Sequence, residues 1–234
     1  MTNPQGNLKS DICQLLTFLD EKPSQSRHHA TSIVAILGED LGVALFREYL
    51  REGDLGSIAT VDKPVTTGSQ RGPRLDRWLD VRWSNGDQTL FQCEIKNWSA
   101  HAIGGKRLSA RANQTEQSDF ARARWRDEWD EDQGCFKKSQ VQKALTKMRP
   151  PKGYEGVHIE PLVIYWVVIH PEGFSQPCFR HPAKKGDFKR VTVFSMSAYL
   201  RNVLKEGTGR LTLNMPQAAA RIDWLNRLVQ PADP

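Results

Sequence analysis

The residues from 162 to 169 (Leu-Val-Ile-Tyr-Trp-Val-Val-Ile) form an unbroken run of β-branched and aromatic side chains. A run of this kind, without polar alternation, predicts a strand that is buried on both of its faces. A strand buried in this way belongs inside a sheet whose two faces are covered, so the run strongly constrains the fold class.

The spacing of apolar residues predicts the other elements. Helical periodicity predicts helices over residues 8–19, 31–51, 108–126, 139–148, 197–204 and 217–229. Strands are predicted over residues 74–83, 89–96, 162–169 and 191–194. The segment 53–74 is rich in Gly, Thr, Ser and Pro and predicts a long irregular connection.

This order of elements, without an internal repeat, predicts one mixed α/β domain over residues 1–234. Within it we expect an N-terminal helix and loop in 1–28, a core over about 29–205, and a C-terminal helix and tail in 206–234. The chain is long enough to bury a substantial core, because 38% of its 234 residues are hydrophobic.

Several classes of protein are disfavoured by composition. No stretch reaches the roughly 20 apolar residues of a membrane helix, and the N-terminus lacks the apolar region of a secretory signal. The four cysteines form no CxxC pair and have no histidine at zinc-ligand spacing, so neither a zinc site nor a disulfide framework is expected. The sequence therefore predicts a cytoplasmic protein with no membrane partner.

Basic residues outnumber acidic ones, with 33 Lys and Arg against 27 Asp and Glu. The resulting net charge of +6 favours polyanionic partners such as nucleic acid. This signal is weak by itself, since many basic domains bind no nucleic acid.

The segment Ser84-Asn85-Gly86-Asp87 separates two predicted strands and is typical of a β-hairpin. If Gly86 takes the left-handed position of a three-residue loop, counting back along the strands sets Asp76 opposite Glu94. A two-residue Asn-Gly turn would shift the register by one and set Asp76 opposite Ile95. The first register is favoured because it brings the charged residues together.

The second strand ends in Glu94-Ile95-Lys96, and strand alternation puts Glu94 and Lys96 on one face. With Asp76 opposite Glu94, two carboxylates and an ammonium group would converge. Carboxylate oxygens suit a hard cation such as Mg²⁺, and a neighbouring lysine can orient an attacking water. The alternative is that Glu94 and Lys96 form an exposed ion pair without a function.

Glu39 is a further candidate. On the predicted helix 31–51 it shares a stripe with Val43, Phe46 and Leu50, which indicates that it faces inward. Gly38 and Gly42 lie four residues apart on the same helix and predict a close approach of the backbone to another element, because each glycine disfavours the helix by about 1 kcal/mol relative to alanine.

Asp76, the hairpin and Glu94-Ile95-Lys96 together resemble the signature of the PD-(D/E)xK nucleases, the restriction-endonuclease-like superfamily. The resemblance spans about Gly38 to Trp98. It implies a central mixed β-sheet flanked by helices and hydrolysis of phosphodiester bonds. It also implies Mg²⁺ (or Mn²⁺) held by Asp76, Glu94 and the carbonyl of Ile95, with Lys96 as the catalytic lysine. Members often carry another glutamate on the helix before the hairpin, a role that Glu39 matches.

The sequence departs from that signature at one point. The residues before Asp76 are Gly72-Pro73-Arg74-Leu75, so the Pro-Asp dipeptide is absent. Asp80 offers a competing spacing to Glu94 and stands as the alternative to Asp76 as first metal ligand. In the favoured register Asp80 lies opposite Leu90, nearer the tip of the hairpin.

Residues after the lysine could contact nucleic acid by stacking or through phosphates. The candidates are Trp98, His101, Lys106, Arg107, Arg111 and Gln114. A second run of basic residues follows, made up of Lys137, Lys138, Lys143, Lys147, Arg149 and Lys152. The alternatives are that the tryptophan packs in the core and that the basic residues form a solvated face.

The sequence thus predicts a metal-dependent nuclease, with DNA as the preferred substrate. A catalytically silent nucleic-acid-binding module on the same fold is the alternative, and a third hypothesis is an unrelated α/β protein whose hairpin merely carries charges. The choice between DNA and RNA, between endo- and exonuclease, and between monomer and dimer stays open.

Overall fold

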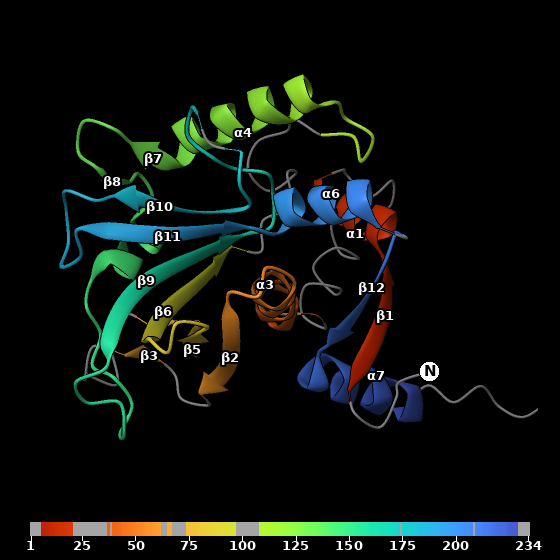
Figure 1. Ribbon diagram of the computed structural model, residues 1–234, viewed down its shortest axis with the longest axis horizontal. Helices are drawn as coiled ribbons and strands as arrows, with labels where there is room; N and C mark the ends of the chain where they lie inside the picture. Colours follow the sequence, from red (N-terminus) through yellow and green to blue (C-terminus); the bar gives the residue numbers. More distant parts are fainter. Residues whose placement is uncertain are drawn as a thin grey trace, which may run out of the picture.

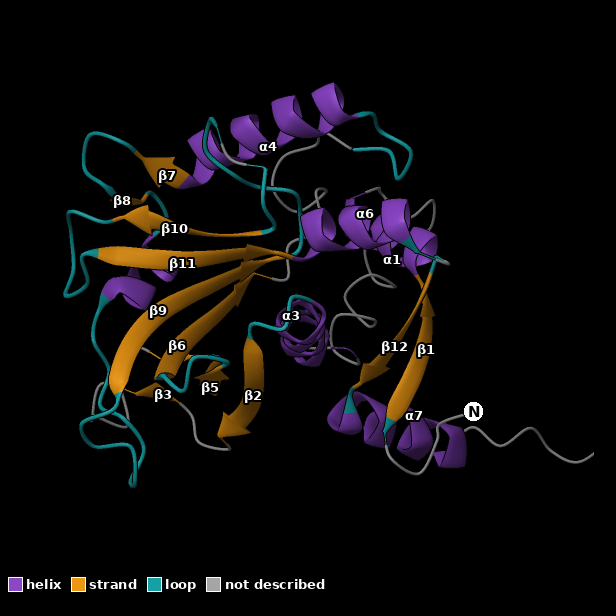
Figure 2. Ribbon diagram, viewed as in Figure 1, coloured by secondary structure: helices purple, strands orange, loops and turns teal. Residues whose placement is uncertain are grey.

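The computed structural model describes residues 6–20, 37, 39–61, 65–66, 74–96, 108–173, 175–207 and 209–228. Its centre is a six-stranded sheet with helices packed on both sides (Figures 1 and 2). The predicted mixed α/β fold is therefore confirmed.

The sheet combines parallel and antiparallel pairs. Its strands, in spatial order, are β10 (Cys178–Pro182), β11 (Arg190–Ser195), β9 (His158–Tyr165), β6 (Gln88–Lys96), β5 (Arg77–Trp83) and β2 (Gly56–Val61). β9 runs parallel to both of its neighbours, β6 and β11, while the remaining pairs are antiparallel. Ile159 to Tyr165 are all buried, so a central strand covered on both faces is confirmed. Its bounds differ from the prediction over 162–169, because β9 begins at His158 and ends at Tyr165, and residues 166–169 are buried but lie beyond the strand.

The two faces of the sheet carry separate apolar clusters. On one face α1 (Ile12–Asp20), α3 (Asp40–Glu52) and α6 (Met196–Glu206) pack against Phe91, Cys93 and Ile164. On the other, α4 (Gln114–Glu128), α5 (Ser139–Gln142) and the 3₁₀ turn η1 (Lys143–Leu145) contribute to a cluster with Leu90 and Val163. Alternate residues of β6 therefore point to opposite clusters, as strand geometry requires.

Helix α3 approaches the sheet closely at Gly42. A Cβ atom at this position would lie 3.4 Å from Cγ2 of Ile95 and 3.3 Å from Cγ2 of Ile164. The expected close approach of the backbone is confirmed at Gly42, and it occurs beside the end of β6 that carries Glu94. Gly38 lies outside the described residues.

Strand β1 (Asn7–Asp11) pairs with β12 (Arg210–Asn214), which is followed by helix α7 (Pro216–Leu228) (Figure 1). The C-terminal helix is confirmed, but the helix predicted over 8–19 is wrong in its first part. Leu8 pairs with Leu213 across the two strands, so pairing with a distant segment overrides the local helical pattern.

The prediction of an irregular connection over 53–74 is also wrong in part, because β2 occupies Gly56–Val61 and pairs with β5. β2 lies at the edge of the sheet, and its residues alternate only partly between apolar and polar. Its content of Gly, Ser and Thr therefore predicted a loop instead of a strand. Two further short pairs complete the described strands: β3 (Val65–Thr66) with β4 (Arg74–Leu75), and β7 (Trp129–Asp130) with β8 (Cys135–Phe136).

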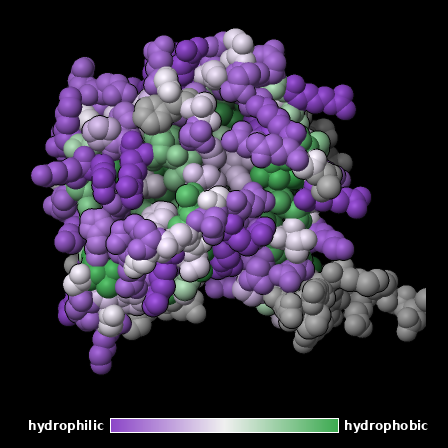
Figure 3. Space-filling model, viewed as in Figure 1, coloured by the Kyte–Doolittle hydropathy of each residue, from purple (hydrophilic) through white to green (hydrophobic). Residues whose placement is uncertain are grey.

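Polar side chains dominate the face of the molecule shown in Figure 3, with apolar side chains visible between them near the middle. Among the helices that the structure describes, none has the length and apolar character needed to cross a membrane.

Candidate active site

The hairpin between β5 and β6 has the three-residue loop. Gly86 has a φ of +89°, and the main-chain amide of Trp83 donates to the carbonyl of Asp87 at 2.9 Å. The paired residues run back to Arg77 opposite Cys93. Continuing this register by one residue sets Asp76 opposite Glu94, so the predicted register is confirmed and the two-residue turn is excluded.

Asp76 sits at a break between two strands. β4 ends at Leu75 and β5 begins at Arg77, so the strand predicted over 74–83 is interrupted at the aspartate. The Asp76 amide donates to the carbonyl of Cys93 at 3.0 Å, and its Oδ2 accepts from the amide of Ile95 at 2.6 Å. These two bonds hold the Asp76 carboxylate against the main chain of the Glu94-Ile95-Lys96 triplet.

Glu94 and Lys96 lie on one face of β6, as predicted. They are only 3% and 6% exposed, and Lys96 Nζ donates to Glu94 Oε1 at 2.5 Å. Burial, followed by the charge of Asp76, raises the pKa of Glu94 above its ordinary value, while the two neighbouring lysines oppose this. The interpretation of an exposed ion pair is wrong, because both charged groups are buried.

Lys143 is a second cation on Glu94. Its Nζ lies 3.1 Å from Glu94 Oε2 and donates to the carbonyl of Arg74 at 2.6 Å. Lys143 belongs to η1, which packs on the same face of the sheet as Glu94. From the sequence, Lys143 was predicted only as one of several basic residues that could contact a phosphate backbone. Its contact with Glu94 could not be predicted, because neither strand alternation nor helical periodicity relates the two positions.

Gln92 fixes the segment that carries Lys143. Its amide is fully buried, and Nε2 donates to the carbonyls of Ala144 and Thr146, each at 2.8 Å. Its Oε1 accepts from the amide of Met148 at 3.0 Å. Sequence analysis missed this residue. The feature that could have identified Gln92 as a site residue is its polar side chain within an otherwise apolar strand, on the same face as Glu94.

Asp76, Glu94, Lys96 and Lys143 form a charged group that we call the Asp76 cluster. Glu39 lies beside this cluster and precedes helix α3. α3 begins at Asp40, so Glu39 occupies the position before its first turn, and the inward orientation derived from a helical stripe does not apply. Its Oε2 lies 3.1 Å from Nη2 of Arg77, the residue after Asp76. Burial, followed by the charge of Asp76, raises the pKa of Glu39 to about 7, and Glu94 contributes in the same direction.

Asp80 lies on the same face of β5 as Trp78 but belongs to a different set of contacts. It accepts from Gln88 Nε2 at 2.8 Å and from the hydroxyl of Tyr154 at 3.4 Å. Four residues of extended strand separate it from Asp76, which corresponds to roughly 13 Å. The geometry therefore favours Asp76 over Asp80 as the partner of Glu94.

The donor chemistry of the cluster suits a hard cation, because the partly buried Asp76 and the buried Glu94 supply carboxylate oxygens close to each other. In the described part of the chain, no three Asp, Glu, His or Cys side chains are arranged as a ready metal site. Both oxygens of Glu94 contact ammonium groups instead. A cation at Glu94 would therefore have to replace at least one lysine.

Four of the candidates for nucleic-acid contact, Trp98, His101, Lys106 and Arg107, lie outside the described residues. Arg111 is exposed in the turn before α4, and Gln114, the first residue of α4, accepts from Lys205 Nζ at 2.9 Å. Within the described residues, no hydrogen bond or ion pair connects Arg111 or Gln114 to the Asp76 cluster, so their role stays a prediction.

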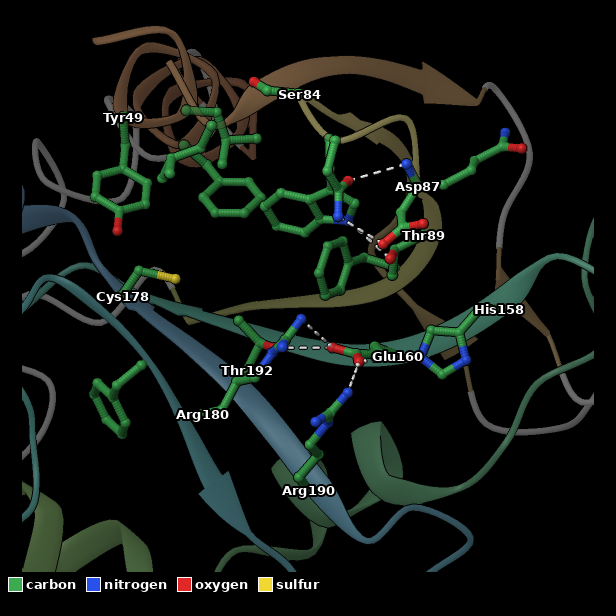
Figure 4. A pocket seen from close by; sticks show the side chains of 18 of the residues that line it. Tyr49, Ser84, Asp87, Thr89, His158, Glu160, Cys178, Arg180, Arg190 and Thr192 are labelled. Atoms are coloured by element: carbon green, nitrogen blue, oxygen red, sulfur yellow. Dashed lines mark hydrogen bonds and ion pairs between the residues drawn. The ribbon is translucent and has the colours of Figure 1, made fainter. Parts of the chain in front are cut away.

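A hollow of about 840 Å³ lies elsewhere on the described surface. It opens on the α3 side of the sheet, where the aromatic Tyr49 lies across from Glu160 and Arg180 (Figure 4). Glu160 is buried and contacts Arg190 at 2.6 Å, His158 at 3.0 Å and Arg180 at 3.3 Å.

Burial alone would raise the pKa of Glu160, but hydrogen bonds from His158 and Arg190 outweigh burial and lower it. This carboxylate is compensated by a histidine on β9 and by arginines on β10 and β11, so its contacts tie these three strands together. Size alone does not make this hollow the better candidate, because Asp76 and Glu94 hold the convergent carboxylates.

No protein-family model, curated protein or solved structure matches the chain. The resemblance to the PD-(D/E)xK nucleases accordingly rests on Asp76, Glu94 and Lys96, with Glu39 at the edge of the cluster.

Proposed function

We propose that this protein is a Mg²⁺-dependent nuclease that hydrolyses phosphodiester bonds of DNA. One observation carries the proposal. The Asp76 carboxylate is bound to the amide of Ile95, between the buried side chains of Glu94 and Lys96. This contact requires both the three-residue hairpin loop and the break in the strand at Asp76.

The electrostatics of the cluster support a catalytic role rather than a structural one. Removing charged groups from water opposes folding, and a buried ion pair seldom recovers more than this loss. Here two carboxylates, Asp76 and Glu94, lie close enough for each to disfavour the ionised form of Glu39. Such stored repulsion is typical of functional sites, where a bound cation or substrate relieves it.

In the proposed reaction, Asp76, Glu94 and the carbonyl of Ile95 would hold Mg²⁺ (or Mn²⁺), which supplies positive charge to the reacting phosphate. Water adds to phosphorus, one P–O bond breaks, and the departing oxygen takes a proton. The Lys96 ammonium would orient the water and offset the negative charge that develops on the phosphate oxygens. Glu39, with its pKa near 7, could accept a proton from the water.

A second candidate function is nucleic-acid binding without cleavage. It is favoured by the contacts of Lys96 and Lys143 with the two oxygens of Glu94, which leave the carboxylate compensated without a metal. The two functions differ in their need for a divalent cation.

The deciding experiment measures cleavage of labelled single-stranded DNA, double-stranded DNA and RNA, with Mg²⁺ and with excess chelator. The protein, Glu94→Gln, Lys96→Ala and the exposed-site control Glu206→Gln are compared. The proposal predicts Mg²⁺-dependent cleavage that is lost in the first two variants and retained in Glu206→Gln. Binding of DNA in chelator without any cleavage would support the silent module instead.

A further inference from the structure

Lys143 and Lys96 hold Glu94 in different ways. Lys96 comes from the same strand as the glutamate, has a side chain only 7% exposed, and donates a hydrogen bond at 2.5 Å. Lys143 reaches Glu94 from another element, is 27% exposed, and lies at 3.1 Å. Among the described residues, the Lys143 ammonium lies beside Glu94 Oε2 without a hydrogen bond of regular geometry. Of the two contacts, that of Lys143 is the weaker and the nearer to solvent.

The main chain of Lys143 is anchored while its ammonium can change partners. Gln92 binds the carbonyls of Ala144 and Thr146, directly after the lysine, and so fixes the origin of the side chain. Beyond that point, a lysine has a flexible four-carbon stem and a compact charge with three donors. Movement of the ammonium by a few ångström requires only rotation of the stem.

Resting on the proposed nuclease function, we propose that Lys143 competes with the divalent cation for Glu94. In the structure its ammonium pairs with Glu94 and, through the carbonyl of Arg74, holds β4 just before Asp76. A cation bound at Glu94 Oε2 replaces this ammonium and repels it. Lys143 is then available to the phosphate of the substrate, which is the other anion at the site.

This competition has an unusual signature, because one substitution changes two properties in opposite directions. Removing the Lys143 ammonium should strengthen binding of Mg²⁺, since the cation no longer displaces an ion pair. The same change should slow cleavage, since the phosphate loses a cationic partner. A lysine that only supported the fold would weaken both properties together.

The test is a calorimetric titration of the intact protein with Mg²⁺, followed by cleavage assays at saturating metal. The variants are Lys143→Ala, Lys143→Met, which keeps most of the apolar stem, and Lys189→Ala, which removes an equal charge at an exposed position. We expect both Lys143 variants to bind Mg²⁺ about 2- to 5-fold more tightly than the protein itself, in line with the loss of a partly exposed ion pair. Their cleavage rate at saturating Mg²⁺ should fall, while Lys189→Ala should match the unmodified protein.

Two outcomes separate this inference from the proposed function. If the protein binds Mg²⁺ and cleaves DNA, but the Lys143 variants bind the metal no more tightly than Lys189→Ala, the competition is refuted and the nuclease stands. If the unmodified protein neither binds Mg²⁺ nor cleaves, both are refuted. Melting curves without metal identify a variant that has failed to fold. If Lys143→Ala fails to fold, the Mg²⁺ affinity of Lys143→Met decides whether Lys143 competes with the cation.

Discussion

The carboxylate of Asp76 accepts a hydrogen bond of 2.6 Å from the main-chain amide of Ile95, one residue after Glu94. The bond crosses from the break between β4 and β5 to the end of β6. It holds the partly buried Asp76 carboxylate against the main chain of β6, directly after the buried Glu94. It places Asp76, rather than Asp80, beside Glu94.

Asp76→Asn should reduce cleavage far more than Asp80→Asn. Only Asp76 lies beside the Glu94 triplet, while Asp80 binds Gln88 and Tyr154 toward the tip of the hairpin. Initial rates at saturating Mg²⁺ should differ by at least about tenfold, which corresponds to roughly 1.4 kcal/mol of barrier. The opposite ranking would show that Asp80 provides the metal ligand.

Glu39 should make stability depend on pH. Its pKa is about 7 in the folded protein, above the ordinary value of 4.5, because of burial and Asp76. Between these two values the folded state binds more protons than the unfolded state, so its stability falls as pH rises through this window. Glu39→Gln removes this titration.

We therefore expect Glu39→Gln to be more stable, relative to the unmodified protein, at pH 8 than at pH 4.5, with a correspondingly larger free energy of unfolding. Denaturant unfolding at both pH values measures this difference, and Glu206→Gln at an exposed position serves as the control. An equal effect of Glu39→Gln at both pH values would mean that Arg77 fully compensates the charge.

Gln92→Leu should misplace Lys143 without touching Glu94. The substitution keeps a side chain of similar size in the core but removes three hydrogen bonds to the main chain of residues 144–148. Stability should fall by about 1 to 3 kcal/mol, because buried carbonyls lose their donors. If Gln92 positions Lys143, Mg²⁺ binding should tighten in this variant as well. An unchanged Mg²⁺ affinity in a folded variant would show that η1 keeps its place without the amide.

Glu160→Ala distinguishes the large hollow from the candidate active site. The buried carboxylate compensates Arg180 and Arg190, whose side chains are 47% and 51% exposed and can regain water when it is removed. We expect a loss of stability of about 1 to 3 kcal/mol and an unchanged cleavage rate at a temperature where the variant is folded. Loss of cleavage in the folded variant would move the active site to the α3 face of the sheet.

Much of the site was predictable because it depends on short stretches of chain. Gly86 favours the left-handed position of the hairpin loop, the loop sets the register, and the register brings Asp76 to Glu94. Strand alternation alone puts Glu94 and Lys96 on one face. The apolar run that begins at Leu162 likewise predicted a strand covered on both sides.

The tertiary structure decided what lies across from these residues. Lys143 reaches Glu94 only because η1 packs against β6 and is bound there by Gln92, and neither contact follows a local periodicity. The first residues of the helix predicted over 8–19 form strand β1 instead, because they pair with β12, whose residues lie some two hundred positions further along the chain. Hydrophobic periodicity is a property of neighbours along the chain, whereas the charge and burial of Glu94 depend on elements brought together by packing. The sequence therefore determined which residues of the hairpin share a face, and the packing of the remaining elements determined which cations compensate them.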